Sequence, residues 1–443
     1  MLANKPRIVL IQPDSPFLDE PLSFPGLGLL YISSFLKKHG YDTEVHDLTG
    51  GGQLPNLANY DMVAFSCQVV HFPFAAEALK QLKPGNPEAI FVIGGPQATW
   101  LSQRCLDAGF DIAVRGEGEL PMLQVVQNLD SIRKKLNEGN GFQKELIAQE
   151  DLDLNSLPFP DWEAIDIQRY RYRLAGRRCM SLVTSRGNCP WGASGHCRFC
   201  SKTNLGRNIR LRFRSVESVL EEAKLLRDRY GFGALMLYDD EIMVNKKRDL
   251  EMFEGLRALD IKFRCMTRAD LVVKEDLKMM AECGCVEICL GAETGDPYLL
   301  EKVVNKGTTV EQNTRFVQWC HEVELKVKAY LIIGLPGESK QSVENTRNWL
   351  ESTRPDNYDL SILEPYPGSE FYEHKELYEI DWKPEDLEQA WKKGSPQYGD
   401  SVVWTPSLSA KEIVKLRNQI LEEVPRGKGG MTSYWGTDAT GGD

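Results

Sequence analysis

Two hydrophobic patterns alternate along the first part of this chain: short apolar runs and longer stretches with helical spacing. The short runs predict buried strands, and the stretches between them predict helices. The predicted strands are 7–13, 42–48, 61–67, 89–95 and 111–119, and the predicted helices are 26–40, 73–83 and 97–108. Strands that alternate with helices predict an α/β fold with a doubly wound, Rossmann-like parallel sheet over residues 1–135, whose ligands bind at the carboxyl ends of the strands.

A second alternating series follows a polar linker at 136–175 that is rich in Pro and Asp. Its predicted strands are 179–184, 233–241, 262–270, 285–295, 326–339 and 359–368, with helices such as 216–231 and 310–324 between them. Six successive strand–helix units favour a partial (β/α)6 barrel over 176–375. Residues 376–443 are less patterned apart from a predicted helix at 410–423, and we expect a C-terminal lid or extension there.

The composition is that of an ordinary globular protein, with 42% apolar and 26% charged residues. The net charge of −11 argues against nucleic acid as a partner, because phosphate contact needs clustered Lys and Arg. The apolar run in Met1–Leu10 is too short for a secretory signal, and no uncharged apolar run approaches the ~18 residues of a membrane span. We therefore expect a cytoplasmic, monomeric protein.

Three of the eleven cysteines lie together in the Gly-rich stretch SRGNCPWGASGHCRFC, with the spacing C-x7-C-x2-C at Cys189, Cys197 and Cys200. In a reducing compartment the cysteines are expected to be free or metal-bound. Others sit in apolar strand or helix patterns, where a buried structural thiol is expected. These are Cys67, Cys265, Cys283, Cys285, Cys289 and Cys320.

Several metal or redox sites are compatible with three thiols in one loop. Structural zinc prefers four ligands, usually from two C-x2-C halves, and His196 is a poor fourth ligand because it directly precedes Cys197. A C-x-x-C redox pair would leave the third thiol unexplained. A [4Fe–4S] cluster held by three thiolates would keep one iron open for another ligand. The loop follows the first predicted strand of the second series, at the edge where barrel folds place their active sites.

Further motifs follow the later predicted strands in a fixed order: YDDE (238–241), TRAD (267–270), GAETG (291–295), IIGLPGE (332–338) and EPYPGSEFYE (364–373). With the cysteine loop before them, this order resembles the radical S-adenosylmethionine (SAM) enzymes. The usual spacing in that family is C-x3-C-x2-C, so the longer loop here leaves the subfamily and the substrate open.

The resemblance implies a [4Fe–4S] cluster on the three loop cysteines and a SAM molecule bound at its open iron. The implied SAM-binding residues are Phe199, Tyr238, Asp240, Arg268, Glu293, Ile333 and Pro336. Asp239 and Glu241, in the same YDDE run, are further candidates for SAM or substrate contacts, although part of this run can simply cap the next helix.

The N-terminal part resembles a cobalamin-binding domain in PGLGLLYISSFLKKHG (25–40), VIGGPQAT (92–99) and VRGEGE (114–119). The alternative is a flavodoxin-like domain that binds a nucleotide or nothing, but neither G-x-G-x-x-G nor a P-loop is present. The implied cobalamin contacts are Pro13, Ser66, Cys67, Gln68, His71, Gly94, Gly95, Arg115, Gly116 and Glu117. The motif D-x-H-x-x-G is absent, so we expect cobalamin without a lower His ligand, and His71 is expected to hydrogen-bond rather than ligate cobalt.

Together the two resemblances imply a cobalamin-dependent radical SAM methyltransferase of the class B type. Such an enzyme moves a methyl group from methylcobalamin to an unactivated sp3 carbon and needs a ferredoxin- or flavodoxin-like reductant. A protein or peptide residue such as glutamine, as for the methyl-coenzyme M reductase glutamine C-methyltransferase, is the first candidate substrate. A small natural-product or phosphorus-containing metabolite that is methylated, cyclised or rearranged is the alternative, and a zinc- and corrinoid-binding sensor is the non-enzymatic one. The aromatic residues expected in a lid are Trp382, Trp391, Tyr398, Trp404, Tyr434 and Trp435.

Overall fold

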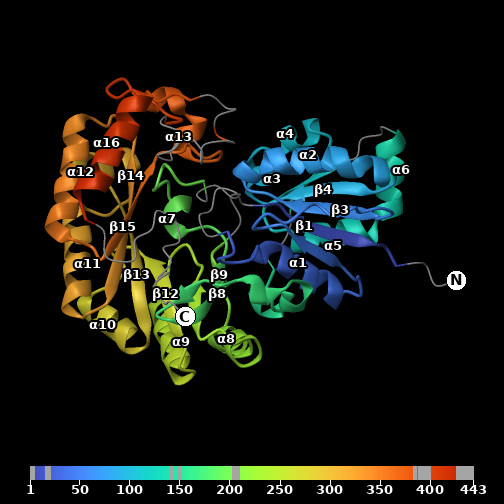
Figure 1. Cartoon of the computed structure of the whole chain (residues 1–443), viewed down its shortest axis with the longest axis horizontal. Coiled ribbons are helices and arrows are strands. Elements are labelled where there is room, and N and C mark those ends of the chain that lie inside the picture. Colours follow the sequence, from blue (N-terminus) through green and yellow to red (C-terminus); the bar gives the residue numbers. More distant parts are fainter. Residues whose placement is uncertain are drawn as a thin grey trace. The chain divides into compact units, whose positions relative to one another are not determined.

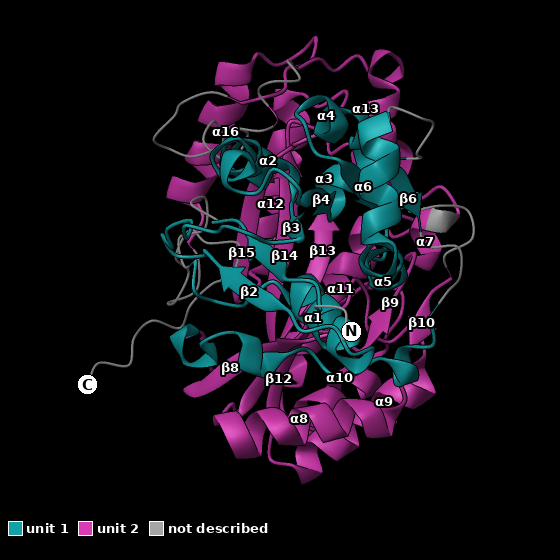
Figure 2. Cartoon of the chain, turned by 90° about the vertical axis from the view of Figure 1, so that its right-hand side faces the viewer, with its two compact units in different colours: residues 1–170 teal, residues 171–443 magenta. Residues whose placement is uncertain are grey.

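The computed structural model describes residues 5–14, 21–138, 144–147, 152–201, 210–382, 387 and 401–425. The chain divides into two compact units, Met1–Tyr170 and Arg171–Asp443 (Figure 2), and each is described by itself. Among the described residues, no helix combines the length and the apolar character needed to cross a membrane. Of the expected lid aromatics, Trp391, Tyr398, Tyr434 and Trp435 lie outside the described residues.

The first unit is built on a six-stranded, all-parallel sheet in the order β2-β1-β3-β4-β5-β6, which confirms the predicted doubly wound fold. Its strands are β1 (Ile8–Gln12), β2 (Glu44–Asp47), β3 (Met62–Ser66), β4 (Ile90–Gly94), β5 (Ile112–Arg115) and β6 (Glu145–Ile147). Its helices are α1 (Leu27–Lys38), α2 (Phe72–Leu82), α3 (Pro96–Trp100), α4 (Ser102–Asp107), α5 (Glu119–Gln127) and α6 (Leu129–Glu138).

Alternate residues of these strands enter two separate cores, one on each face of the sheet. In β3, Val63 and Phe65 pack toward α2 and α4, whereas Met62 and Ala64 pack toward α1 and α5. All four side chains are almost fully buried. Figure 1 shows α2, α3 and α4 along one face of the sheet and α1 and α5 along the other. A strand that is buried on both faces reads as a continuous apolar run, which is why the pattern was visible in the sequence.

Two local features of this unit differ from the sequence pattern. The helix expected at 97–108 is two helices, α3 and α4, because Leu101 has non-helical dihedral angles (φ −126°, ψ 44°). Helix α6 ends inside the expected linker, and strand β6, which pairs in parallel with β5, lies within it. Strand β6 has only three residues, and α6 has few apolar residues, so neither gives a long hydrophobic run. The domain boundaries at 135, 175 and 375 stay predictions.

The second unit contains a seven-stranded sheet in the order β15-β14-β13-β12-β11-β8-β7. Six strands run parallel in sequence order and only β7 is antiparallel, so the series forms the predicted partial (β/α)6 barrel. The strands are β7 (Arg173–Leu174), β8 (Arg177–Leu182), β11 (Ala234–Leu237), β12 (Lys262–Thr267), β13 (Cys285–Glu293), β14 (Lys326–Ile333) and β15 (Asn357–Ile362). The barrel is partial because β8 and β15, the first and last of the six, do not pair with each other within the described chain.

Helices cover the outer face of this sheet, with α10, α11, α12 and α16 along β13–β15 in Figure 1. The helices are α8 (Val216–Tyr230), α9 (Lys246–Ala258), α10 (Lys274–Glu282), α11 (Val310–Glu322), α12 (Lys340–Thr353) and α16 (Ala410–Glu423). The outer face is apolar: Phe263 of β12 stacks on Phe253 of α9 with ring centroids 4.8 Å apart.

The inner face of the same sheet is polar and charged. The Arg264 guanidinium lies 2.7 Å from the Glu287 carboxylate of β13, and the Lys328 ammonium of β14 lies 2.8 Å from the Asp359 carboxylate of β15. Arg264 and Lys328 are fully buried, and such charges are retained in a protein interior only when they are paired. The partial barrel is therefore lined by charged pairs rather than by an apolar core.

Candidate cofactor sites

The cysteine loop leaves the carboxyl end of β8 and lies between two short antiparallel strands, β9 (Ser185–Arg186) and β10 (Arg212–Phe213). This pairing ties the two ends of the loop together. Gly187 has a φ of +117°, and a Cβ there would lie 2.1 Å from the carbonyl oxygen of Arg210. Only glycine permits this close approach of the two chain segments.

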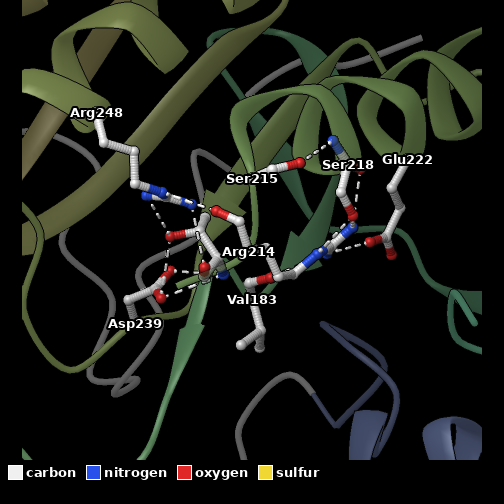
Figure 3. A network of polar contacts seen from close by, with 8 residues as sticks. Val183, Arg214, Ser215, Ser218, Glu222, Asp239 and Arg248 are labelled. Carbon is white, nitrogen blue, oxygen red and sulfur yellow. Dashed lines mark hydrogen bonds and ion pairs between the residues drawn. The ribbon is translucent and has the colours of Figure 1, made fainter. Parts of the chain in front are cut away.

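Buried polar contacts fix both ends of the loop to the barrel (Figure 3). The Asp239 carboxylate, directly after β11, accepts hydrogen bonds from the Thr184 amide (3.1 Å) and the Ser185 hydroxyl (2.5 Å). At the other end, Arg214 donates to the Val183 carbonyl (3.0 Å) and pairs with Glu222 of α8 (2.5 Å). These contacts position the loop at the carboxyl edge of the sheet.

Asp239 therefore has a structural role in the described residues. Burial raises its pKa to about 6, and the hydrogen bonds from Ser185 and Thr184 oppose that rise. The Arg248 side chain donates to both the hydroxyl and the carbonyl of Thr184, which completes this network. The sequence indicates Asp239 as a candidate for SAM or substrate contact, but its carboxylate already accepts the hydrogen bonds that hold the start of the loop.

Burial separates the three loop cysteines from the rest. None of the eleven cysteines is in a disulfide, and Cys189, Cys197 and Cys200 alone are half-buried while the other eight are buried. This confirms the buried thiols expected elsewhere. Burial raises the pKa of Cys197 to about 11, while the positive charges of Lys306 and Arg268 oppose that rise. A metal would therefore have to displace the thiol protons as it binds.

No three His, Cys, Asp or Glu side chains converge on a single metal ion anywhere in the described part of the chain. The thiolates of a four-iron cluster bind three different irons, so they are not required to converge on one point. Three half-buried thiols outside disulfides, in one anchored loop, are a suitable donor set for such a cluster.

The loop is also bound to the segment that follows β13. The amide of Cys197 donates to the Asn305 carbonyl (3.1 Å), and the amide of Arg198 donates to the Val304 carbonyl (3.1 Å). The Nδ1 atom of His196 lies 3.1 Å from the same Asn305 carbonyl oxygen. His196 thus helps to fix the loop to the segment that follows β13.

Charged side chains gather around Cys197. Lys306 and Glu293 form a buried pair with 2.5 Å between Nζ and Oε1, and Arg268 Nη1 lies 4.0 Å from the Cys197 sulfur. Glu241 belongs to the same group, since burial raises its pKa to about 8 while Lys306 and Arg268 oppose that rise. One carboxylate oxygen of Glu241, Oε2, is buried and has no hydrogen-bond partner in the described structure.

This cluster joins residues that the sequence predicted and residues that it missed. Arg268 and Glu293 come from the predicted SAM-binding set, and both are buried beside the loop. Lys306 was missed, because the segment VVNKGTT after β13 has no strand or helix periodicity that would place it at the site. This cluster offers an oriented carboxylate, a lysine and an unsatisfied carboxylate oxygen beside a thiol. It is suited to a ligand with both an ammonium and a carboxylate group.

The other predicted SAM-binding residues also lie at the carboxyl edge of the barrel. Tyr238 and Asp240 follow β11, and the Tyr238 side chain is 44% exposed. Ile333 is the last residue of β14 and Pro336 lies in the loop after it. Phe199 lies within the cysteine loop and is half-buried. Their roles stay predictions.

In the first unit, the predicted cobalamin contacts all lie at or just beyond the carboxyl ends of β1, β3, β4 and β5. In the order β2-β1-β3 the strand order reverses between β1 and β3, and doubly wound sheets bind ligands at such a point. Gly95 has a φ of +85°, and a Cβ there would lie 2.8 Å from the Cys67 carbonyl oxygen. The ends of β3 and β4 therefore approach each other closely.

Several of these residues are engaged with their neighbours. Burial lowers the pKa of His71 to about 4, and its Nδ1 accepts a hydrogen bond from the Gln68 amide (3.3 Å). This geometry agrees with the expected hydrogen-bonding role. Arg115 donates to the Thr99 carbonyl (3.0 Å), and the Gly116 amide donates to the Thr99 hydroxyl (3.0 Å).

The sequence missed Gln97, the second residue of α3. Its side chain is fully buried, and neither its amide nitrogen nor its amide oxygen has a hydrogen-bond partner in the described structure. Burying an amide without hydrogen-bond partners costs free energy. This edge of the sheet therefore offers a hydrogen-bond donor and an acceptor that lack partners in the described structure. Corrin rings carry amide side chains, so an unsatisfied amide at the ligand-binding edge fits a corrinoid. The motif GGPQAT marked this turn, but the sequence alone gave no sign that the amide lacked partners.

Two family models match the chain. The radical SAM superfamily model matches residues 187–350, which include the cysteine loop, and the B12 binding domain model matches residues 21–126.

Curated relatives share both halves of the chain. The anaerobic magnesium-protoporphyrin IX monomethyl ester cyclase of Cereibacter sphaeroides is 29% identical over 83% of this chain, which spans 63% of the length of that protein. The cytidylyl-2-hydroxyethylphosphonate methyltransferase of Streptomyces wedmorensis is 25% identical over 82% of this chain and 80% of its own length.

Solved structures share the fold. The radical SAM methyltransferase TsrM from Kitasatospora setae, with cobalamin and a [4Fe–4S] cluster bound, has a TM-score of 0.62 and 17% identity over 86% of this chain and 76% of its own. The cobalamin-dependent radical SAM enzyme OxsB has a TM-score of 0.62 and 18% identity over 95% of this chain and 61% of its own.

Proposed function

We propose that this chain transfers a methyl group from cobalamin to a substrate carbon. It belongs to the cobalamin-dependent radical SAM enzymes of the methyltransferase type. The observation that carries this proposal is the pairing of two sites in one chain. A B12-binding match covers the ligand-binding edge of the first sheet, and a radical SAM match begins in the anchored three-cysteine loop.

The three cofactors are a [4Fe–4S] cluster, SAM and cobalamin; when bound, they supply a carbon-centred radical and a methyl group. The chain's part is to bind and orient them. In this proposal Cys189, Cys197 and Cys200 hold the cluster, and their thiol protons leave as the metal binds. The buried networks at Asp239 and Arg214 keep the loop in place.

In this proposal the charged cluster beside Cys197 binds the amino acid part of SAM. The Glu293 carboxylate is suited to the ammonium group and the Lys306 ammonium to the carboxylate group, so SAM binding would exchange the pair seen at 2.5 Å for two pairs with the ligand. The unpartnered oxygen of Glu241 offers a second acceptor. Phe199, Tyr238, Asp240, Ile333 and Pro336 remain candidates for the rest of SAM.

The proposed cobalamin site is the carboxyl edge of β1, β3, β4 and β5, with Gln97 added to the predicted contacts. The absence of the motif D-x-H-x-x-G supports a lower cobalt face without a His ligand, and Nδ1 of His71 is engaged by the Gln68 amide. The EPR spectrum of the cob(II)alamin form tests this: we expect no nitrogen superhyperfine splitting, and such splitting would contradict it.

Two substrate classes remain candidates. The names of a solved and a curated relative mention small molecules, namely tryptophan and a cytidylylated phosphonate. This supports a small metabolite as the substrate. A protein or peptide residue such as glutamine is the other candidate, for which an open partial barrel leaves access. A cyclase among the relatives makes cyclisation the second candidate reaction. We further propose a ferredoxin- or flavodoxin-like reductant and a monomeric, cytoplasmic enzyme.

Incubation with methyl-labelled SAM under anaerobic reduction separates these outcomes. The proposal predicts label in a product of a cell extract, and fractionation then shows whether the labelled product is a protein or a small molecule. The Cys197→Ser variant should transfer no label. SAM cleavage without any label transfer would favour cyclisation or rearrangement and contradict methyl transfer.

A further inference from the structure

The spacer that lengthens the cysteine loop contains a tryptophan that contacts Arg268. Trp191 lies in α7 (Pro190–Ala193), inside the seven-residue spacer between Cys189 and Cys197. The Arg268 guanidinium carbon lies 4.4 Å from the centre of the Trp191 ring, which is cation–π geometry.

Arg268 is held on three sides. Its guanidinium forms a two-pronged pair with Asp270, with distances of 2.9 Å from Nε to Oδ1 and 3.0 Å from Nη2 to Oδ2. Trp191 covers its face, and its remaining nitrogen, Nη1, lies 4.0 Å from the Cys197 sulfur. With 1% of its side chain exposed, Arg268 has a fixed orientation toward that thiol.

We propose that the long spacer serves to seat Trp191 against Arg268, and that Arg268, held in this way, makes the cluster on Cys197 easier to reduce. This inference rests on the proposed role of Cys197 as a cluster ligand. Reduction adds a negative charge to the cluster, and a fixed cation beside a ligand sulfur stabilises that charge. Hydrogen bonds to the sulfurs and nearby charges are the levers by which proteins set iron–sulfur potentials.

The counterion of Arg268 does not cancel this effect. The Asp270 side chain is 24% exposed, whereas that of Arg268 is 1% exposed, so water screens the carboxylate more than the guanidinium. Lys306 is the other cation beside Cys197, but its charge is matched by a buried carboxylate, Glu293, at 2.5 Å. Of these two cations, Arg268 is therefore the one whose paired carboxylate is more exposed to water.

Redox titration of the reconstituted, SAM-free enzyme, followed by EPR, tests the proposal. Arg268→Gln should lower the midpoint potential, with a tenfold change in the reduction equilibrium corresponding to about 59 mV for one electron. Asp270→Asn keeps the cation and removes its counterion, so it should raise the potential. Trp191→Leu should lower the potential by less than Arg268→Gln, and Trp191→Phe should stay close to the wild type.

The opposite signs distinguish electrostatic tuning from a structural role, because a loosened loop would shift the Arg268→Gln and Asp270→Asn variants in the same direction. Trp404→Phe, at a 36% exposed tryptophan outside the loop, is the matched control and should leave the potential unchanged. Equal potentials in all variants, or shifts of one sign, would overturn the inference. A wild type that binds no iron would instead overturn the proposed function.

Discussion

The two parallel sheets of this chain use their faces in different ways. The first sheet is apolar on both faces, so that Val63 and Met62, neighbours on one strand, enter two separate hydrophobic cores. The second sheet is apolar only where helices cover it, and its inner face holds the ion pairs Arg264–Glu287 and Lys328–Asp359. Burying charge stabilises a fold less than burying apolar surface does. The inner face of the second sheet is therefore held by paired charges rather than by apolar packing.

The largest expected effect lies in the first sheet. Phe65→Ala removes an aromatic ring that is 2% exposed and packs edge-on against Phe110, and it should lower the free energy of unfolding of the first unit by about 3–5 kcal/mol. Hydrogen exchange measured by mass spectrometry reports this unit separately. Phe65→Leu is the matched control, with a smaller loss. A loss below about 1 kcal/mol for Phe65→Ala would contradict a packed two-faced core.

The second sheet should respond differently, because its inner side chains depend on pairing. Lys328→Met leaves Asp359 without its partner and should cost about 3 kcal/mol. Replacing both residues, as Lys328→Met with Asp359→Leu, should recover most of that loss. Chemical unfolding of the two variants measures the difference. A double variant that is as unstable as the single one would show that the pair is not the source of the cost.

A smaller effect is expected at the ligand-binding edge of the first sheet. Gln97→Leu removes a buried amide without partners, so it should stabilise the cobalamin-free protein by about 1–3 kcal/mol. The same change should weaken cobalamin binding, as measured by equilibrium titration. Destabilisation with unchanged cobalamin affinity would mean that the amide has a structural partner instead.

A pH dependence is expected in the second unit, and it is small for each pH unit that is changed. Burial raises the pKa of Glu338, after β14, to about 8, while amide hydrogen bonds from Gly334 and Leu335 oppose that rise. The folded state therefore holds a proton that the unfolded state releases near pH 4.5. Stability should fall as pH rises from about 4.5 to about 8, by up to about 1.4 kcal/mol per pH unit. Glu338→Gln should flatten this dependence in unfolding experiments, and an unchanged slope would contradict it.

The contrast between the sheets also explains what could be predicted from the sequence. Strands buried on both faces, such as β3 and β4, appear as continuous apolar runs, and the motifs after the barrel strands mark their carboxyl ends. Strand β6 was missed, because its residues Glu145–Ile147 are few and only partly apolar. The split between α3 and α4 depends on the backbone at Leu101, which no residue pattern announces.

At the candidate site, the sequence identified residue types but not their partners. Cys197, Arg268 and Glu293 were expected at the barrel edge and are found there. Two of their neighbours come from other segments. Lys306 lies in the stretch after β13, and Trp191 lies in the seven-residue spacer, of which the sequence shows only the unusual length. Such contacts depend on the tertiary fold, which spacing alone does not reveal.

The most direct test of the central claim is EPR of the anaerobically reconstituted, reduced protein, with and without SAM. The account predicts iron and sulfide in the ratio of a [4Fe–4S] cluster, and a reduced-cluster signal that changes shape when SAM binds the open iron. The Cys189→Ala, Cys197→Ala, Cys200→Ala triple variant should lose both. Stoichiometric zinc without iron, or a cluster signal that SAM does not alter, would contradict it.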